Sequence, residues 1–570
     1  MKKVIMTLAV LFFILVVAVG CDDKKTDPKV DDENLTDGEV TDDPNVLDKD
    51  ENGEFITAGA NNSNDKGEGD YGDSTNEEPG EEEDSGAEDD AEREIVESDI
   101  YKVEGTTIWV VNRYKGLIAI DMKDPKALKV VGKAPFEGIP GEMYLQEGRA
   151  YILVTGLNGK DLDDKEGYWG GRSMSKVIVV NTEKPSAPKV IGSYELDGTI
   201  VDSRQVGDVI YVAATQYKYY WYWCDTRDEY GKDQITLISI NVSDPADIKK
   251  VDEVSLEGTA YTIYVSQKSI YVAEANYDYW NDDYDQKYPV TLFDISDPDG
   301  KIVKKSEFET DGFMSDRWKM YEKGDVFFAV STSDQWGGGD SMIESFDISD
   351  PENIEQINKL TFMTGQQLYG TKFEGDRMYA VTYFQQDPLH VIDISDPANL
   401  IELGQLEVPG WSTHLEIRGN KILSVGIDDT DGWKTKVSMY DVSDPENPKE
   451  MSMIAIGSNY SWSEATQDWK AFKIYDDLGL ILLPVNEYEE NTWRYMYKLY
   501  LLDFDLAKGL KQRGSVVSDS PVMRGVALEN EKIISIGDRH VMMIDAADRD
   551  KPEILSTAVM AYYVEDLDIC

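Results

Sequence analysis

A short phrase recurs nine times between residues 120 and 553 of this chain. Each copy is a hydrophobic strand that ends in Asp or Asn and continues into a turn of the Ser-Asp-Pro type. Subtraction of the Asp or Asn numbers gives steps of 42 to 62 residues, a period typical of a four-stranded propeller blade. The sequence therefore predicts an all-β fold, a closed β-propeller of four-stranded antiparallel blades. The clearest copies occupy residues 293–298, 346–351, 392–397 and 440–445, and weaker copies lie at Asp121, Asn181, Asn241, Asp503 and Asp545.

Residues 366–408 illustrate one expected blade. Four short runs rich in Val, Ile, Tyr and Leu are separated there by Gly, Asp and Pro, which is the pattern of antiparallel strands joined by turns. Asp and Ser side chains bond to nearby backbone amides and Pro fixes φ, so we interpret the repeated turn as structural rather than functional. The four runs are residues 366–373, 378–384, 388–394 and 400–408.

The number of blades has two readings. Nine units exceed the usual four to eight, so either the ring has nine blades, or an irregular unit near Asp503 or Asn181 leaves eight. The ring is expected to close, because open ends would leave unpaired strand edges. Residues 100–103 should then lie beside residues 554–559.

Several segments resemble one known family. Residues 97–103, 116–121 and 207–212 are similar to the bacterial secreted and lipoprotein β-propeller family whose blades carry Asp-Ile/Val-Ser-Asp-Pro turns. The resemblance covers residues 97 to about 560 and implies a propeller domain over residues 98–570. It implies little about activity, because most members of that family are known only as predicted envelope proteins.

The first twenty-one residues predict the compartment. Two lysines precede an apolar run from Val4 to Val19, and Gly20 and Cys21 follow it, which is the order of a secretory signal. The end of this run resembles the bacterial lipobox, which implies a signal peptide over residues 1–20 and a lipid on Cys21. The alternative is an unlipidated secreted form, because Ala18 stands where lipoboxes favour Leu. We expect a protein of the bacterial cell envelope, outside the cytoplasm and anchored to a membrane by its N-terminal lipid.

Residues 21–97 are predicted to be an acidic, disordered tether. Between Asp22 and Glu97 there are thirty Asp and Glu and six Lys and Arg, a net charge of −24, with few large apolar residues. Such a composition cannot bury enough surface to offset chain entropy. The remaining domain carries 81 acidic and 48 basic residues, a net charge of −33 by subtraction. Nucleic acid and anionic lipid surfaces are therefore poor partners for it.

One part of the tether matches the beginning of an EF-hand loop. Asp48, Asp50 and Asn52 occupy the first, third and fifth ligand places, and Gly53 occupies the sixth. The twelfth place is Gly59 rather than Glu. We favour a chance match in an Asp-rich run, and the alternative is a weak Ca²⁺ site that would stiffen the tether.

Long aromatic loops are expected between the second and third strands of several blades. Because they occupy the same place in the repeat, they should emerge on one face of the ring. Aromatic rings beside carboxylates suit sugar rings or a partner protein's surface, and the alternative is that the rings pack on one another. The candidate binding residues in these loops are Tyr220, Trp221, Trp223, Trp280, Trp336, Trp433 and Trp493.

Four further candidates should lie near the centre of the ring. Arg204, Arg317, His414 and Arg524 begin or follow expected inner strands, and three arginines could hold an anionic group. The alternative, which we favour, is that the arginines pair with nearby carboxylates, as Asp202 and Asp316 would permit.

The chain shows few signs of catalysis. His390, His414 and His540 are isolated in sequence, and no nucleophile elbow, phosphate loop or Cys-x-x-Cys knuckle is present. With Cys21 acylated, Cys224 and Cys570 remain, either as a disulfide or as two thiols.

These features predict an anchored propeller that binds a protein or glycan partner through one loop face, without catalysis or cofactor. The alternative is an envelope hydrolase or lyase at the mouth of the channel, using His414 or a carboxylate with Arg317 or Arg524. A third interpretation is an assembly scaffold in an envelope complex, since fold alone does not determine function.

Overall fold

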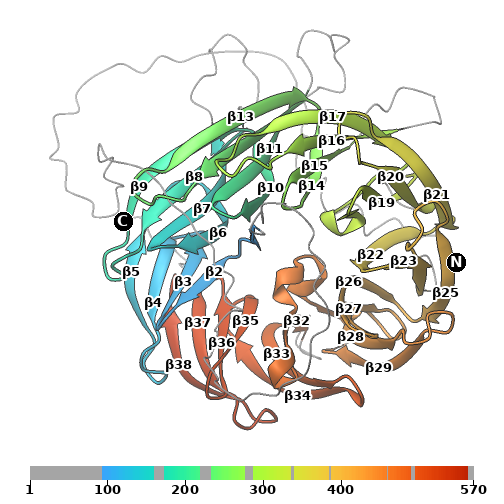
Figure 1. Cartoon of the computed structure of the whole chain (residues 1–570). Coiled ribbons are helices and arrows are strands. Elements are labelled where there is room, and N and C mark those ends of the chain that lie inside the picture. The colour runs from blue at the N-terminus through green and yellow to red at the C-terminus, as the bar shows by residue number, and fades with distance from the viewer. Residues whose placement is uncertain are drawn as a thin grey trace, which may run out of the picture. The chain divides into compact units, whose positions relative to one another are not determined.

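The computed structural model describes residues 93–158, 173–217, 233–275, 287–334, 339–383, 387–458, 460–488 and 494–562, all within one compact unit of the chain. Their strands form nine antiparallel sheets, and Figure 1 shows the sheets as blades arranged in a ring. The predicted β-propeller and the larger of the two blade counts are confirmed. Within these ranges, no helix is long and apolar enough to span a membrane. The expected signal peptide, Cys21 and the Asp48, Asp50 and Asn52 site lie outside the described residues.

The first three blades follow one another along the chain, and in each blade the first strand is innermost (Figure 1). Blade 1 comprises β2 (Tyr101–Glu104), β3 (Thr107–Asn112), β4 (Gly116–Asp121) and β5 (Lys129–Ala134). Blade 2 comprises β6 (Ile139–Gln146), β7 (Arg149–Asn158), β8 (Ser173–Asn181) and β9 (Lys189–Asp197). Blade 3 comprises β10 (Thr199–Val206), β11 (Val209–Gln216), β12 (Gln234–Asn241) and β13 (Lys249–Glu257).

The next three blades repeat this order, with one short 3-10 helix before blade 5. Blade 4 comprises β14 (Ala260–Val265), β15 (Ser269–Glu274), β16 (Tyr288–Asp294) and β17 (Val303–Thr310). Blade 5 comprises η2 (Arg317–Lys319), β18 (Met320–Lys323), β19 (Val326–Thr332), β20 (Ser341–Asp347) and β21 (Glu355–Met363). Blade 6 comprises β22 (Gln367–Glu374), β23 (Arg377–Tyr383), β24 (Asp387–Asp393) and β25 (Ile401–Val408).

The last three blades include the irregular unit that the sequence indicated near Asp503. Blade 7 comprises β26 (Trp411–Arg418), β27 (Lys421–Asp428), β28 (Lys434–Asp441) and β29 (Lys449–Ile456). Blade 8 comprises β30 (Ser461–Trp462), η3 (Glu464–Thr466), η4 (Trp469–Ala471), β31 (Lys473–Tyr475), η5 (Asp476–Leu478), β32 (Leu480–Tyr488), β33 (Tyr495–Asp505) and β34 (Gly509–Ser518). Blade 9 comprises β35 (Val522–Leu528), β36 (Lys532–Gly537), β37 (His540–Asp545) and β38 (Glu553–Val559).

Blade 8 is a full blade whose inner strand is interrupted. Both β30 and β31 pair with β32, and the chain between them forms η3 and η4. Ser463 and Asp468 cap these short helices by accepting hydrogen bonds from the amides of Ala465 and Lys470. The insertion lies inside the ring, where Figure 1 shows it as an orange coil.

The repeated turn is structural, as the sequence predicted. In blade 5 the Asp347 carboxylate accepts a hydrogen bond from the Ser349 amide (2.9 Å), and Asp350 accepts one from Glu352 (3.1 Å). Blade 6 has the same bonds at Asp393 (2.8 Å) and Asp396 (3.0 Å). These bonds favour the ionised carboxylates and hold the pKa of Asp347 and Asp393 below its usual value.

A bulge between the third and fourth strands recurs in every blade. The fourth-strand residue at this bulge is Gly or Ser in seven blades and Asp or Asn in the other two, and in most blades it lies against the turn of the next blade. For example, the Ser556 hydroxyl of blade 9 donates to the Pro125 carbonyl of blade 1 (2.7 Å). A Cβ atom on Gly132 of blade 1 would lie 2.1 Å from the Pro185 carbonyl oxygen of blade 2. The nine residues are Gly132, Gly192, Asp252, Ser306, Asn358, Gly404, Ser452, Gly514 and Ser556.

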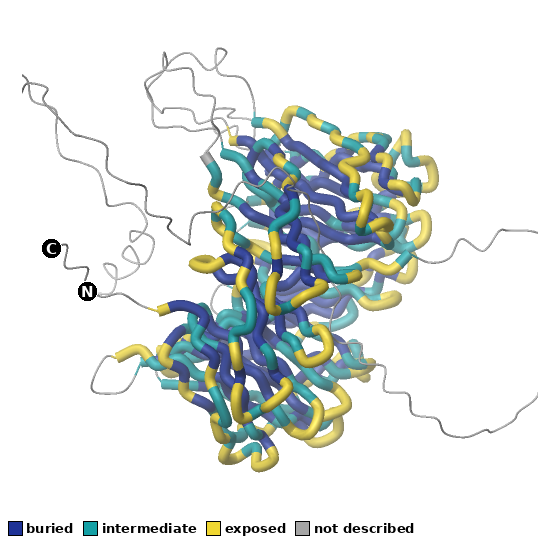
Figure 2. The backbone as a smooth tube through the Cα atoms, turned by 90° about the vertical axis from the view of Figure 1, so that its left-hand side faces the viewer, coloured by how far each residue is buried: buried dark blue, intermediate teal, exposed yellow. Residues whose placement is uncertain are grey.

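The core lies between adjacent blades. Figure 2 shows buried residues along the strands and exposed residues mainly at the turns. One hydrophobic cluster joins blades 1 and 9, with Tyr101, Ile108, Val526 and Ala558 among its members. The ring therefore closes, as predicted, by side-chain packing between the two terminal blades. The expected neighbours differ in part, because β38 is the outer strand of blade 9 and lies beside the outer strand β5, whereas residues 101–104 form the inner strand of blade 1. Blades 1 and 9 are each built from one continuous stretch of chain.

Residues 93–99, which we call the strap, precede blade 1 and reach across the ring. β1 (Ile95–Val96) adds a fifth strand to blade 3 by pairing with the inner edge of β10. Further along, Asp99 exchanges backbone hydrogen bonds with Met143 of blade 2 (3.1 and 2.9 Å). The predicted tether included residues 93–97, whereas the structure shows them in contact with the propeller.

Candidate functional site

The two faces of the ring carry different connections. Strands alternate in direction within a blade, so the loops between second and third strands share one end with the links between blades. We call this end the loop face, and the opposite end, which carries the Ser-Asp-Pro turns, the turn face. Of the predicted loop residues, Trp433 is described. Tyr220, Trp221, Trp223, Trp280, Trp336, Trp493, Cys224 and Cys570 lie outside the described residues.

An arc of aromatic rings crosses blades 6 to 8 on the loop face. Trp411 packs against Tyr383 at 4.6 Å and edge-on against Trp433 at 5.3 Å between ring centroids. Trp433 forms a backbone bridge with Tyr460, which comes directly before β30. In blade 8, Tyr488 packs against Tyr495 at 4.2 Å. We call the set Tyr383, Trp411, Trp433, Tyr460, Tyr488 and Tyr495 the aromatic arc.

Several rings of the arc are open to solvent. Trp433 and Tyr460 are each 56% exposed and Tyr495 is 52% exposed, whereas Trp411 is buried beneath Trp433. Carboxylates accompany the rings, since the Tyr383 hydroxyl donates to Asp429 (2.5 Å) and the Asp431 side chain is 85% exposed. The rings of the arc therefore pack on one another and still present exposed faces.

The inner strands bring the predicted arginines toward the strap. Arg204 donates to the Asp202 carboxylate at 2.6 Å and lies 3.9 Å from Glu97. Arg317 pairs with the same Glu97 at 2.6 Å. Asp316 instead pairs with Lys319 at 2.6 Å and caps η2. The arginines thus contact carboxylates, and the strap supplies one that sequence reasoning did not identify.

His414 and Arg317 meet around two tryptophans. The His414 ring lies 5.3 Å from Trp318 and 5.7 Å from Trp469, and the Arg317 guanidinium lies 4.5 and 4.9 Å from the same two rings. The His414 Nε2 atom is 2.7 Å from the Glu416 carboxylate. Burial alone would raise the pKa of Glu416, but the hydrogen bond and charge of His414 lower it to about 2.

Arg524 forms a second charged centre. Its side chain is fully buried and pairs with Asp99 at 2.8 Å and with Asp468 of blade 8 at 2.5 Å. Lys473 lies 3.2 Å from Asp99 on the other side. Burial alone would raise the pKa of Asp99, but Arg524 and Lys473 hold it well below its usual range. The strap, blade 8 and blade 9 are therefore joined by buried charges.

A third pair near the strap was missing from the sequence analysis. Lys470 lies 2.6 Å from Glu142 of blade 2, and the Ser98 hydroxyl donates to the same carboxylate at 2.6 Å. Lys102 is buried nearby and donates to the Glu97 carbonyl at 3.0 Å. Burial lowers the pKa of Lys102 to about 7, although Asp99 opposes this shift. No local sequence signal marks these residues, because their partners come from distant blades.

Two buried glutamates lie in blades 4 and 5, away from the strap. Glu274 accepts a hydrogen bond from the Thr291 hydroxyl (3.5 Å), and Glu344 accepts hydrogen bonds from the Gln356 side chain (2.8 Å) and the Asp311 amide. Burial raises the pKa of both to about 7, and the charges of Glu307 and Asp311 act in the same direction. Both are therefore acids whose ionisation opposes folding.

Replacing Glu344 with Gln is expected to flatten the pH dependence of the melting temperature. The folded pKa is raised above the unfolded value of about 4.5, so the folded state binds more protons and stability falls as pH rises through 7. Melting curves between pH 5 and 8 should show a weaker decline for Glu344→Gln than for the natural chain. The exposed Glu355→Gln on β21 is the control, and an unchanged slope in Glu344→Gln would contradict the assignment.

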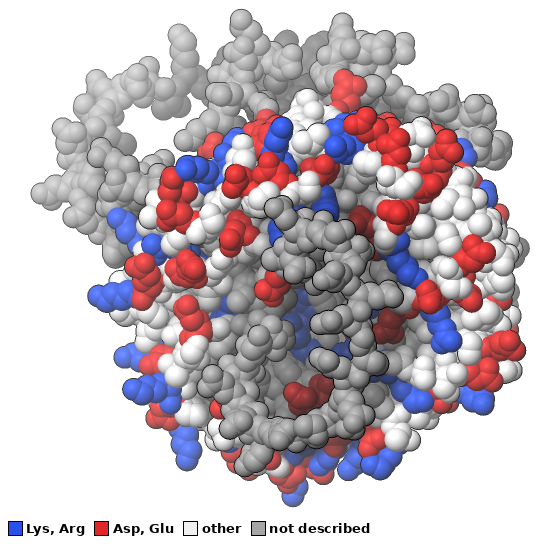
Figure 3. Space-filling view, viewed as in Figure 1, with Lys and Arg blue, Asp and Glu red and all other residues white. Residues whose placement is uncertain are grey.

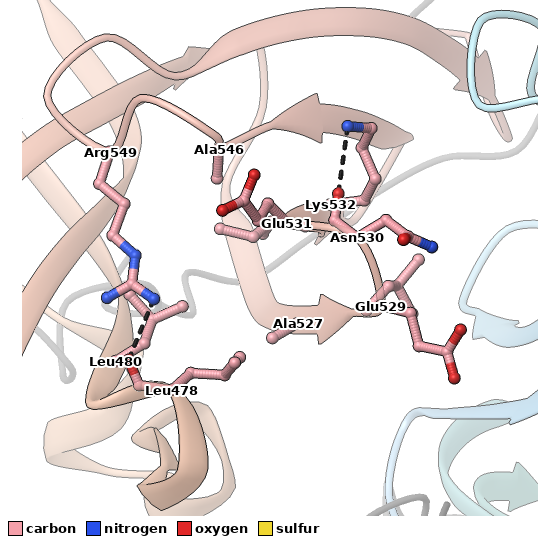
Figure 4. Close-up of a pocket in the computed structure, with 11 residues that line it drawn as sticks. Leu478, Leu480, Ala527, Glu529, Asn530, Glu531, Lys532, Ala546 and Arg549 are labelled. Carbon is pink, nitrogen blue, oxygen red and sulfur yellow. Dashed lines mark hydrogen bonds between the residues drawn. The ribbon is translucent and has the colours of Figure 1, made fainter. Parts of the chain in front are cut away.

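The outer surface offers little else that resembles a site. Figure 3 shows acidic and basic side chains intermixed around the rim. Among the described residues, no group of three or more His, Cys, Asp or Glu could hold a metal ion. A pocket of about 210 Å³ lies between blades 8 and 9 at the turn face, with Leu478, Leu480 and Ala527 among its lining residues (Figure 4). Arg549 on its rim pairs with Asp503 at 2.6 Å, so this charge contributes to the contact between the blades.

A ring of nine four-stranded antiparallel sheets with its loops gathered on one face is a β-propeller. The chain belongs to the family described as the Beta propeller domain, whose model matches residues 91–237 and 224–548. The finer expectation of a bacterial lipoprotein subgroup stays a prediction.

Two curated relatives are archaeal. An uncharacterized protein of Methanocaldococcus jannaschii is 24% identical over 398 residues, which cover 55% of this chain and 63% of that protein. An uncharacterized protein of Archaeoglobus fulgidus is 30% identical over 195 residues, which cover 34% of this chain and 29% of that protein. The chain thus spans less than two thirds of the length of either relative.

Two solved structures are similar to this chain at a low level. The periplasmic gluconolactonase PpgL of Pseudomonas aeruginosa is 9% identical, with a TM-score of 0.35, over 57% of this chain and 91% of that chain. Sqt1 of Chaetomium thermophilum is 11% identical, with a TM-score of 0.39, over 70% and 93% of the two chains. Similarity at this level has no bearing on activity.

Proposed function

We propose that this protein is a non-catalytic binding scaffold that holds a glycan chain or a protein surface on its loop face. The observation that carries the proposal is the aromatic arc, in which Trp433, Tyr460 and Tyr495 are each more than half exposed. Exposed aromatic rings on a rigid sheet offer large contact areas at little loss of side-chain entropy.

The chemistry of the arc favours a glycan chain as its ligand. The backbone bridge between Trp433 and Tyr460 places rings of blades 7 and 8 side by side, and Tyr460 leads directly into β30, which pairs with β32. Each of these rings can stack on the face of one sugar in a chain. Asp429 and Asp431 beside the rings can accept hydrogen bonds from sugar hydroxyls. A basic protein surface is the other ligand that such a row of rings and carboxylates suits.

We also propose that Cys21 carries the lipid anchor and that the acidic tether holds the propeller outside the cytoplasm. The support is the order of charged, apolar and small residues before Cys21. The strap begins at Arg93 on the turn face, beside Gly207 and Ile295, at the end of the ring opposite the loop face. Cys21→Ser should abolish incorporation of a fatty-acid label and release the protein from membranes.

Replacing Trp433 and Tyr460 with Ala is expected to weaken ligand binding at least tenfold. Each stacking ring contributes about 1 kcal/mol, and 1.4 kcal/mol corresponds to a factor of ten. A glycan array and a pull-down with envelope proteins would identify the ligand, and titration of the variants would measure the loss. Tyr114→Ala is the matched control, because Tyr114 is 51% exposed on the loop face of blade 1 and lies outside the arc. Equal affinity of both variants would contradict the proposal.

An envelope hydrolase or lyase is the second candidate, and the specific observation in its favour is the His414–Glu416 pair beside Arg317. A carboxylate that orients a histidine is an arrangement used for general acid-base catalysis. Against it, the His414 side chain is 5% exposed and packs between two tryptophans. Hydrolysis of a glycan ligand that disappears in His414→Ala, with binding retained, would establish this alternative.

A further inference from the structure

We propose that the centre of the ring is a binding site for an extended peptide that carries a basic residue followed, four and six positions later, by carboxylates. In this structure the chain's own strap fills the site, with Arg93, Glu97 and Asp99 at those positions. We infer that a peptide of the same chemistry supplied by another molecule competes with the strap. The proposal is independent of the aromatic arc.

The backbone of the strap is held as an added strand. Ile95 pairs with Val206 and Val96 with Gln205 on the inner edge of β10, and the Gly207 amide donates to the Glu94 carbonyl at 2.8 Å. Strand addition of this kind is a common way to bind peptides, because main-chain bonds supply affinity for any extended sequence. The inner edge of a propeller blade is otherwise an unpaired strand edge.

The side chains of the strap meet complementary groups at both ends. Arg93 donates to the Ile295 carbonyl at 2.7 Å and to the Gln267 carbonyl, both in blade 4. Beyond β1, the carboxylates of Glu97 and Asp99 contact arginines of blades 3, 5 and 9: Arg204, Arg317 and Arg524. Carbonyl oxygens at one end and guanidinium groups at the other select both the charge pattern and the direction of a bound strand.

The strap does not satisfy the site completely. Four buried polar atoms of the strap and of the residues around it have no hydrogen-bond partner among the described residues: Arg93 Nη1, Glu97 Oε2, Gln205 Oε1 and Arg317 Nη2. An unsatisfied buried polar atom costs about 1–3 kcal/mol. The strand itself is two residues long, so few ladder bonds hold it. Because the strap leaves these atoms unpaired and forms few strand hydrogen bonds, a peptide that forms more hydrogen bonds at the same site can displace it.

The test uses the full-length chain and a fluorescent peptide with the sequence of residues 91–100. In Arg93→Ala/Glu97→Gln, where the strap is weakened and Asp99 is kept, the peptide should bind at least tenfold more tightly than to the natural chain, as measured by anisotropy. Arg317→Ala in that background should reduce binding at least tenfold. A peptide with Gln in place of Glu97 and Asn in place of Asp99 should also bind far more weakly. Absence of peptide binding to the folded double variant would overturn the proposal.

Hydrogen exchange on the natural chain covers the case in which the double variant does not fold. A saturating excess of the peptide should speed exchange of the amides of residues 94–96, and unchanged exchange would overturn the proposal.

Sedimentation of the double variant alone identifies the source of the competing strand. If the fraction of dimer rises with protein concentration and falls on addition of the peptide, a second copy of the chain donates its strap. If the variant is monomeric and binds the peptide, the competing strand comes from a different protein.

Discussion

Arg524→Met is expected to lower the free energy of unfolding by about 3–5 kcal/mol, the usual effect of removing one partner from a buried charge pair. The Arg524 side chain is fully buried between Asp99 of the strap and Asp468 of blade 8. The substitution leaves the buried Asp99 with Lys473 as its nearest cation. Urea unfolding followed by tryptophan fluorescence would measure the change.

A matched control lies in blade 8. Arg513 also bridges two carboxylates, Asp503 and Asp550, but Asp550 is 55% exposed, so Arg513→Met should change the free energy of unfolding by about 1 kcal/mol or less. The double variant Arg524→Met/Asp99→Asn should recover part of the stability lost in Arg524→Met, because the uncompensated charge is gone. Equal destabilisation by Arg524→Met and Arg513→Met would show that the buried charge pairs of Arg524 contribute no more to stability than the partly exposed pairs of Arg513.

The nine repeat units could be counted from the sequence because the turn is a local structure. Asp347 and Ser349 form their hydrogen bond within three residues of chain, and nearby Pro351 fixes its own backbone angle. The same bond recurs in other blades, so each copy of the phrase marks one turn between a third and a fourth strand. The unit of blade 8 was counted for the same reason, but the sequence left open whether this irregular unit was a full blade, because its inner strand is interrupted.

The contacts of the strap could not be predicted, because they join residues far apart in the chain. Asp99 and Arg524 are separated by 425 positions, and their pairing depends on closure of the ring. Glu97 and Asp99 also follow a long acidic segment, and composition alone therefore assigned the residues up to Glu97 to the tether. The repeat predicts that the aromatic loops emerge on the same face of the ring. The packing of Trp433 on Trp411 could not be predicted, because the folded chain brings these two side chains together.

The small residues between blades carried a signal that the sequence analysis missed. By subtraction, each lies eleven positions after the Asp or Asn of the repeated phrase, as Gly132 follows Asp121 and Gly404 follows Asp393, with twelve in blade 4. An offset of eleven residues in eight of the nine copies indicates that these positions have the same structural role. This role became evident in the structure, where the bulge places this residue beside the turn of the neighbouring blade.

Gly132→Ala is therefore expected to destabilise the protein by about 2–3 kcal/mol, as overpacking of a close contact does. The new methyl group would lie 2.1 Å from the Pro185 carbonyl oxygen and 2.6 Å from Pro188 Cδ. Backbone and proline ring cannot rotate away as a flexible side chain can, so blades 1 and 2 must separate. Thermal and urea unfolding would measure the loss.

Gly141→Ala tests whether the effect of Gly132→Ala arises from the contact between blades rather than from the loss of a glycine. Gly141 also lies in a strand, and the nearest atom to its added methyl group would be 3.7 Å away, so a change within about 0.5 kcal/mol is expected. If both variants unfold alike, the blades can separate without loss, and the recurrence of small residues after the bulge would need another cause. A selective loss in Gly132→Ala would show that the position eleven residues after each turn sets the spacing of the blades, and with it the closure of nine of them into one ring.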